Sequence, residues 1–143
     1  MELYFEDIQV GQEMPTLVAE PINKIQQVMY AGASGDFNAL HLDDDFAKAL
    51  GMQGGVITAG MQVMGKVGQA ITDWVPKKYL KKFGVRFSGI TKPGNIITVT
   101  GKVIDKQASN QLITCEVTAQ DETGNVKITG RFEAVLPSKS KNT

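Results

Sequence analysis

The chain contains 143 residues, of which 42% are hydrophobic and 21% are charged, so we expect one globular domain that is too short to hold two independent cores. Fifteen basic residues balance fifteen acidic ones, which argues against nucleic acid or an anionic membrane surface as a partner. A single cysteine, Cys115, and a single histidine, His41, exclude an internal disulfide and leave no plausible metal site.

The first half of the chain predicts a short strand followed by three helices. Short apolar runs over residues 5–20 predict a loop and then a strand. Apolar side chains recur at helical spacing over residues 21–34, which predicts a helix with Gly35 as its exit. Acidic residues at the start and a glycine after the end predict a short helix over residues 42–51. Residues 58–74 predict a long glycine-rich helix, and we expect it to be largely buried because four small residues indicate close packing.

The second half of the chain predicts four strands. Residues 83–90, 96–106, 111–120 and 126–136 are rich in β-branched side chains and mostly alternate. Turn residues between them predict three successive antiparallel connections, and the polar tail over residues 137–143 is expected to fray. The single cysteine falls within the third strand, where a buried structural thiol is expected. A sheet of this kind needs cover on one face, so we expect an α+β domain with the long helix lying across the sheet.

The only histidine lies in the stretch SGDFNALH, residues 34–41, five positions after Asp36. Along a continuous helix these two side chains would point about 140° apart. Gly35 and Asn38 tolerate left-handed backbone angles, however, so a helix that stops there lets His41 fold back towards Asp36. Two interpretations follow: an ordinary helix end with turn hydrogen bonds, or a general acid/base pair of imidazole and carboxylate.

Residues 30–51, YAGASGDFNALHLDDDFAKALG, resemble the signature of the MaoC-like, R-specific enoyl-thioester hydratases and dehydratases. In that signature an aromatic residue is followed by S-G-D-x-N-P-[LIV]-H. The resemblance continues through VITAGM and the strand-rich second half, so it covers most of the chain. It implies a single hot-dog domain over residues 1–143, an antiparallel β-sheet wrapped around a long central α-helix, which agrees with the α+β architecture expected above.

The resemblance implies roles for individual residues. The family's catalytic aspartate and histidine fall on Asp36 and His41, and its motif asparagine falls on Asn38. By analogy, Asp36 and His41 hold one water, whose oxygen adds to the β-carbon of a trans-2-enoyl thioester while a proton reaches the α-carbon on the same face. The product is an (R)-3-hydroxyacyl thioester, and dehydration is the reverse. Gly60 matches the family's glycine whose N–H binds the thioester carbonyl, although a purely packing role for this glycine stays open.

Three further residues complete the expected substrate-binding set with Asn38. Met61 carries a mobile thioether that suits either the core or an acyl-chain pocket, and Arg86 either contacts a phosphate or pairs across strands. Ala59 stands where many family members carry a histidine, and we expect it to change pocket hydration or substrate preference. Ala39 replaces the usual proline, which loosens the turn but removes no reacting group.

The resemblance also implies partners. The substrate is expected to be a thioester of coenzyme A or of an acyl carrier protein, with no separate cofactor. An exposed edge strand predicts a homodimer, and similarity to mycobacterial-type dehydratase subunits leaves a heterodimer open. The acidic start of the chain and the lack of long apolar runs predict a cytoplasmic location. Two other functions stay open: a hot-dog thioesterase, and a non-catalytic subunit that binds acyl thioesters or stabilises a partner.

Overall fold

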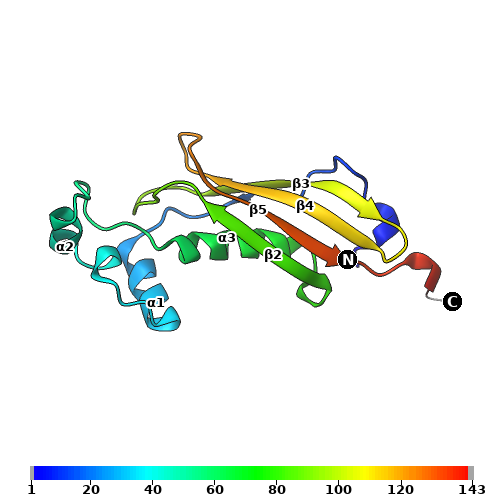
Figure 1. Ribbon diagram of the computed structural model, residues 1–143, viewed down its shortest axis with the longest axis horizontal. Coiled ribbons are helices and arrows are strands. Elements are labelled where there is room, and N and C mark those ends of the chain that lie inside the picture. Colours follow the sequence, from blue (N-terminus) through cyan, green and yellow to red (C-terminus); the bar gives the residue numbers. More distant parts are fainter. Residues whose placement is uncertain (1, 142–143) are drawn as a thin grey trace.

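The computed structural model describes residues 2–141 and contains one five-stranded antiparallel sheet, with the long helix α3 lying along one face (Figure 1). Helices α1 and α2 extend beyond one end of the sheet (Figure 1). Within the described residues, no helix is long and apolar enough to span a bilayer. The helices are α1 (Lys24–Ser34), α2 (Asp44–Ala49) and α3 (Gly60–Trp74), with 3₁₀ turns η1 (Phe5–Asp7), η2 (Ala39–His41), η3 (Lys77–Tyr79) and η4 (Lys139–Lys141). The strands are β1 (Leu17–Val18), β2 (Leu80–Phe87), β3 (Thr98–Gln107), β4 (Leu112–Gln120) and β5 (Val126–Val135).

The strand order, β1-β3-β4-β5-β2, corrects one of the predicted connections. Strands β3, β4 and β5 form two successive hairpins, as their turn sequences predict. Strand β2, however, pairs with β5 rather than with β3. The segment between β2 and β3 does turn, since Asn95 N–H donates to the carbonyl of Lys92 at 3.1 Å, but it does not close a hairpin. It is held elsewhere: Gly94 N–H donates to the carbonyl of Ile22 at 2.6 Å, and Ile96 N–H donates to the Glu122 carboxylate at 2.9 Å. Strand β2 is therefore an edge of the sheet.

The core lies between α3 and the inner face of the sheet. Strand β4 alternates strictly: Ile113, Cys115 and Val117 are buried, and the residues between them are partly exposed. Fully burying a valine or isoleucine side chain contributes about 1.5–3 kcal/mol, so this shared core fixes α3 on the sheet. Burial raises the pKa of the Cys115 thiol to about 12, and the thiol therefore stays protonated at neutral pH. The prediction of a buried structural cysteine is confirmed.

Within this single chain α3 is buried on one side only, so the expectation of a largely buried helix is wrong. The sheet covers one face of the helix, and Met61 on another face is 57% exposed. Close packing along the glycines is also absent at two positions: a Cβ built on Gly65 would meet nothing within 4 Å, and one on Gly68 would meet only the Phe83 ring at 3.7 Å. At Gly60, the first residue of the helix, a built Cβ would lie 3.0 Å from the Phe87 ring, and this glycine belongs to the site described below. The buried residues of α3 are Val63, Val67, Ala70 and Ile71.

Helix α1 begins at Lys24, three residues later than predicted, because Asn23 caps it. The Asn23 side chain accepts a hydrogen bond from Gln26 N–H at 2.8 Å, and the Gln26 side chain accepts one from Asn23 N–H in return. The helix exposes its apolar stripe and buries its other side: the exposed side chains are Ile25, Val28 and Met29, and the buried ones are Gln27 and Ala31. The periodicity thus predicted the helix, but the buried face carries a polar glutamine.

The tail over residues 137–143, for which fraying stays a prediction, makes hydrogen bonds to the beginning of the chain at residues 137–139. The carbonyl of Pro137 accepts a hydrogen bond from Phe5 N–H at 2.9 Å. Ser138 is buried, and its hydroxyl donates to the Glu6 carboxylate. These contacts tie the end of the chain to its beginning. Residues 142–143 lie outside the described part of the chain.

Candidate active site

The turn after α1 brings Asp36 and His41 together. Gly35 ends the helix in the left-handed conformation with φ of 75°, and its N–H donates to the carbonyl of Ala31. The Asp36 carboxylate accepts a hydrogen bond from Asn38 N–H at 3.2 Å, and the Asn38 side chain accepts one from Leu40 N–H at 3.0 Å. The second bond starts η2, which ends at His41. The turn hydrogen bonds of the ordinary helix end and the convergence of the pair are therefore both present.

The Asp36 and His41 side chains face one another across a short gap. His41 Nε2 lies 3.9 Å from Asp36 Oδ2, too far for a direct hydrogen bond but close enough for one bridging water. His41 Nδ1 lies 2.8 Å from the carbonyl oxygen of Ile57. A carbonyl only accepts, so Nδ1 carries the proton and the neutral ring presents its Nε2 lone pair to the gap. The Asp36 side chain is 48% exposed and that of His41 is 16% exposed, so the gap opens to solvent on the carboxylate side.

A cavity of about 170 Å³ adjoins His41 and reaches the start of α3. Gly60 is the first residue of this helix, and Ala59 caps it without a side-chain hydrogen bond. Because the first N–H groups of a helix have no partner inside the helix, the N–H of Gly60 is available to an acceptor in the cavity. The Phe87 ring packs on this glycine, since a Cβ at Gly60 would lie 3.0 Å from two ring carbons. The lining residues are His41, Ile57, Thr58, Gly60, Val63, Phe87, Gly89, Ile90, Thr91, Lys127 and Ile128.

The residues expected to bind substrate occupy different places. Asn38 is next to the dyad, with its side-chain oxygen engaged by the η2 turn. Ala59 is buried at the start of α3, and Met61 is exposed one residue into the helix. Neither lines the cavity that holds His41. Arg86 lines a groove together with Arg131 and does not line that cavity either.

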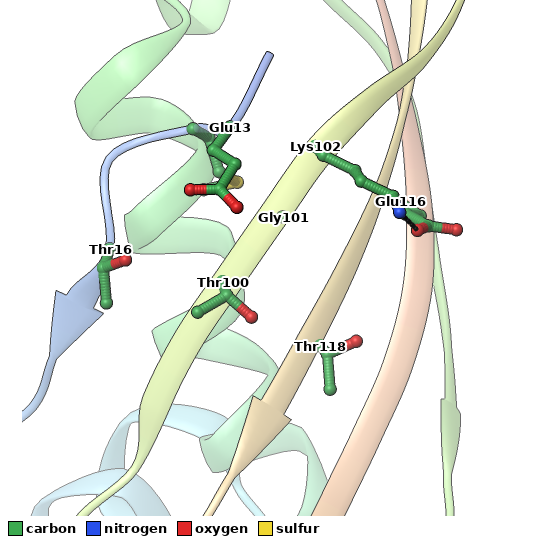
Figure 2. Close-up of a pocket in the computed structure, with 8 residues that line it drawn as sticks. Glu13, Thr16, Thr100, Gly101, Lys102, Glu116 and Thr118 are labelled. Atoms are coloured by element: carbon green, nitrogen blue, oxygen red, sulfur yellow. Dashed lines mark ion pairs between the residues drawn. The ribbon is translucent and has the colours of Figure 1, made fainter. Parts of the chain in front are cut away.

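A polar hollow of about 240 Å³ lies on the face of the sheet away from α3, which is seen behind the strands in Figure 2. Lys102 of β3 and Glu116 of β4 form an ion pair across it, with Nζ and Oε1 3.3 Å apart. The hollow offers hydroxyls and a paired cation but no imidazole, so we take the His41 cavity as the candidate active site. Its lining residues are Glu13, Met14, Thr16, Thr100, Gly101, Lys102, Glu116 and Thr118.

Sequence reasoning missed a buried ion pair in the wall of the His41 cavity. Lys127, which lines the cavity, donates to the carbonyl of Ile90 at 2.7 Å, and its Nζ lies 3.1 Å from Asp121 Oδ2. The Asp121 side chain is 6% exposed, and its other oxygen accepts from the Thr123 hydroxyl and from Asn125 N–H. The sequence DETGN predicts this turn, but nothing in its spacing shows that Lys127 returns to the cavity.

The Asp121→Asn variant is expected to be destabilised more at neutral than at acidic pH. The Thr123 hydroxyl, Asn125 N–H and Lys127 hold the pKa of the Asp121 carboxyl well below its usual range. A depressed folded-state pKa stabilises the fold above the unfolded-state pKa of about 3.9, and this contribution is lost as the pH falls towards the folded-state value. Asparagine also leaves Lys127 without its buried counter-ion. Urea titrations near pH 7 and pH 3 measure the effect, and the unfolding midpoint of the variant should differ from that of wild type less at pH 3 than at pH 7. The exposed variant Asp105→Asn is the control. An equal effect of this control, or a midpoint difference that does not change with pH, would contradict a stabilising role for the Asp121 carboxylate.

Comparison with known proteins places the chain in a family. Residues 7–125 match the family model for the MaoC-like domain. An (R)-specific enoyl-CoA hydratase from Rhodospirillum rubrum is 27% identical over an alignment that covers 95% of this chain and 93% of the relative. The structure of the R-hydratase PhaJ1 from Pseudomonas aeruginosa superposes with a TM-score of 0.84 at 23% identity, covering 96% of this chain and 88% of that one. The ChsH1–ChsH2 complex from Mycobacterium tuberculosis gives a TM-score of 0.78 at 26% identity, covering 90% of this chain and 98% of its match.

These likenesses confirm the hot-dog fold predicted from the sequence. The matched region includes the whole SGDFNALH stretch, the start of α3 and most of the sheet. The chain is therefore a member of the MaoC-like dehydratase family.

Proposed function

We propose that this protein reversibly hydrates trans-2-enoyl thioesters to (R)-3-hydroxyacyl thioesters. The observation that carries the proposal is the 3.9 Å separation of His41 Nε2 and Asp36 Oδ2 at the mouth of a cavity that begins at a helix N-terminus. The relative named as an (R)-specific enoyl-CoA hydratase supports the same reaction class.

The dyad takes one proton from the water and delivers it to the substrate. A water in the gap donates one hydrogen bond to the Asp36 carboxylate and one to His41 Nε2, whose lone pair is free because Nδ1–H is donated to the carbonyl of Ile57. As the water oxygen bonds to the β-carbon, Nε2 takes a water proton, and the electrons of the double bond move towards the thioester. The dyad then gives a proton to the α-carbon on the same face, and both groups end as they began.

Gly60 is proposed to stabilise the negative charge that develops on the thioester oxygen. Its N–H stands at the positive end of the 15-residue helix α3. A preorganised donor of this kind favours a developing oxyanion over a neutral carbonyl. The Cβ-free position matters as well, because the Phe87 ring occupies the space that a side chain would need.

The acyl carrier is proposed to be coenzyme A or an acyl carrier protein, with no further cofactor. Asn38 acts through the turn that shapes the dyad. For Ala59 and Met61 we propose indirect effects on the pocket, since both adjoin Gly60. Arg86 is proposed to meet the carrier rather than the acyl group, because it lines a groove outside the cavity.

A homodimer is proposed for the active form. Strand β2 is an eight-residue edge, and unpaired edges favour association with another strand. Large apolar side chains are also exposed on α1 and just after it, and one is exposed at the start of α3: Ile25, Val28, Met29, Phe37 and Met61. A heterodimer is the other outcome, as in the relative whose structure is described as a complex of two named chains.

Incubation with crotonyl-CoA tests the function. Hydration removes the enoyl absorbance without releasing free thiol, and light scattering on the same preparation shows whether the active species has twice the 15.5 kDa mass of one chain. Thiol release would instead identify a thioesterase. Binding of crotonyl-CoA with neither change, and no rescue by a second chain, would indicate a non-catalytic subunit and overturn the proposal.

A further inference from the structure

Gln27 is a buried polar side chain that the proposed reaction does not use. It is 2% exposed and lies on the inner side of α1, although its helix neighbour Val28 is 60% exposed. Burying an amide without hydrogen-bond partners destabilises a fold. A glutamine at this position therefore needs partners that an apolar residue would not need.

The partners of Gln27 are the two segments that hold His41. Its Nε2 donates to the carbonyl of His41 at 2.7 Å and has a longer contact, 3.5 Å, with the carbonyl of Ile57. Its Oε1 accepts from the Thr58 hydroxyl at 2.6 Å. Because both carbonyls can only accept, the amide nitrogen must face them, which fixes the orientation of the carboxamide.

These contacts surround the hydrogen bond that sets the state of the imidazole ring. Ile57 accepts from His41 Nδ1 through its carbonyl and donates its N–H to the carbonyl of Leu40 at 3.2 Å. Two hydrogen bonds therefore join the segment around His41 to the segment around Ile57. The Gln27 side chain contacts both segments as well. A shift of Ile57 relative to His41 would release Nδ1–H and permit the other neutral tautomer, in which Nε2 carries the proton.

We propose that Gln27, held by Thr58, is a positioning residue that keeps neutral His41 in the Nδ1–H tautomer with the Nε2 lone pair facing Asp36. The expected effect on turnover rests on the proposed function, whereas the tautomer of His41 is a property of the free protein and does not. Gln27 lines neither the cavity nor the gap between the dyad residues, so its loss should lower kcat and leave KM nearly unchanged.

The single histidine of the chain makes the tautomer directly measurable. The test uses the full chain without a polyhistidine tag, labelled with ¹⁵N in the imidazole ring, at a pH where His41 is neutral. In wild type the spectrum should show a protonated Nδ1 and an unprotonated Nε2. Gln27→Leu should add the opposite tautomer and lower kcat for crotonyl-CoA by about 10- to 100-fold, the loss expected from a misplacement on the order of 1 Å, with KM within about twofold.

Two further variants keep the test decisive. Thr58→Val removes the hydroxyl that holds Gln27 and should shift the tautomer in the same direction by a smaller amount, so it serves if Gln27→Leu does not fold. Gln69→Leu makes the same change at an exposed position of α3 and should alter nothing. A wild-type ¹⁵N spectrum in Gln27→Leu, or in Thr58→Val where only that variant folds, overturns the proposal even if thermal stability falls. Inactive wild-type protein would instead refute the hydratase function, while the spectra would still decide the role of Gln27.

Discussion

The Asp36→Asn variant is expected to lose hydratase turnover by about 10²- to 10⁴-fold, the usual contribution of a general acid or base. The amide keeps the size of the carboxylate but cannot hold the negative charge that orients the water and stabilises protonated His41. This loss corresponds to about 3–5 kcal/mol of transition-state stabilisation. Steady-state kinetics with crotonyl-CoA measures it.

The fold of this variant should remain intact because Asp36 is half exposed and its hydrogen bond to Asn38 N–H can be kept by the amide oxygen. Circular dichroism and thermal unfolding check this directly. Asp45→Asn, an exposed aspartate in α2, is the matched control and should retain wild-type turnover. Full activity of Asp36→Asn would refute the dyad, and so would full activity of His41→Ala.

Replacing Gly60 with proline is expected to reduce kcat by about 10²- to 10³-fold relative to replacement with alanine, which is the cost of removing one oxyanion donor. Proline removes the N–H proposed to bind the thioester oxygen. The backbone accepts it, since Gly60 is the first residue of α3 and Ala59 before it is extended, with φ of −59° and ψ of 133°. Pre-steady-state kinetics of both variants would separate this loss from effects on binding.

Alanine is the proper reference for this experiment because it adds the same Cβ against the Phe87 ring but keeps the N–H. The ring lies 3.0 Å from the added Cβ and is 48% exposed, so it can move outward in both variants. A loss of activity that both variants show is then caused by crowding of the added Cβ against Phe87. Equal turnover of the folded Gly60→Pro and Gly60→Ala proteins would show that this N–H takes no part in catalysis.

The local elements of the fold could be predicted because they depend on short-range chemistry. Alternation in β4 and small turn residues specified the hairpins, and Gly35 specified the end of α1. The pairing of β2 with β5 could not be predicted in the same way. The segment that leaves β2 is held through Gly94 and Ile96 by residues distant in sequence, and the composition of a turn carries no information on such long-range contacts.

In the candidate active site, too, some residues could be predicted from the sequence and others could not. The resemblance to the MaoC-like family pointed to Asp36, His41 and Gly60, and the structure brings Asp36 and His41 together. Gln27 gave no signal, because a glutamine within an apolar helical pattern ordinarily indicates a solvated face. The opposite arrangement occurs in α1, where the apolar stripe is exposed and the glutamine is buried. Only a three-dimensional structure reveals that reversal.

The hydrogen bond from His41 Nδ1 to the carbonyl of Ile57 has a consequence for the path of the proton. A carboxylate in that place would stabilise the charged ring with a full negative charge, whereas a main-chain carbonyl offers only its dipole. A main-chain carbonyl cannot accept a proton outright, so the ring has a single working nitrogen. In the proposed reaction the proton therefore enters and leaves His41 through Nε2 alone. The imidazole holds one proton for a time and does not pass it from one ring nitrogen to the other.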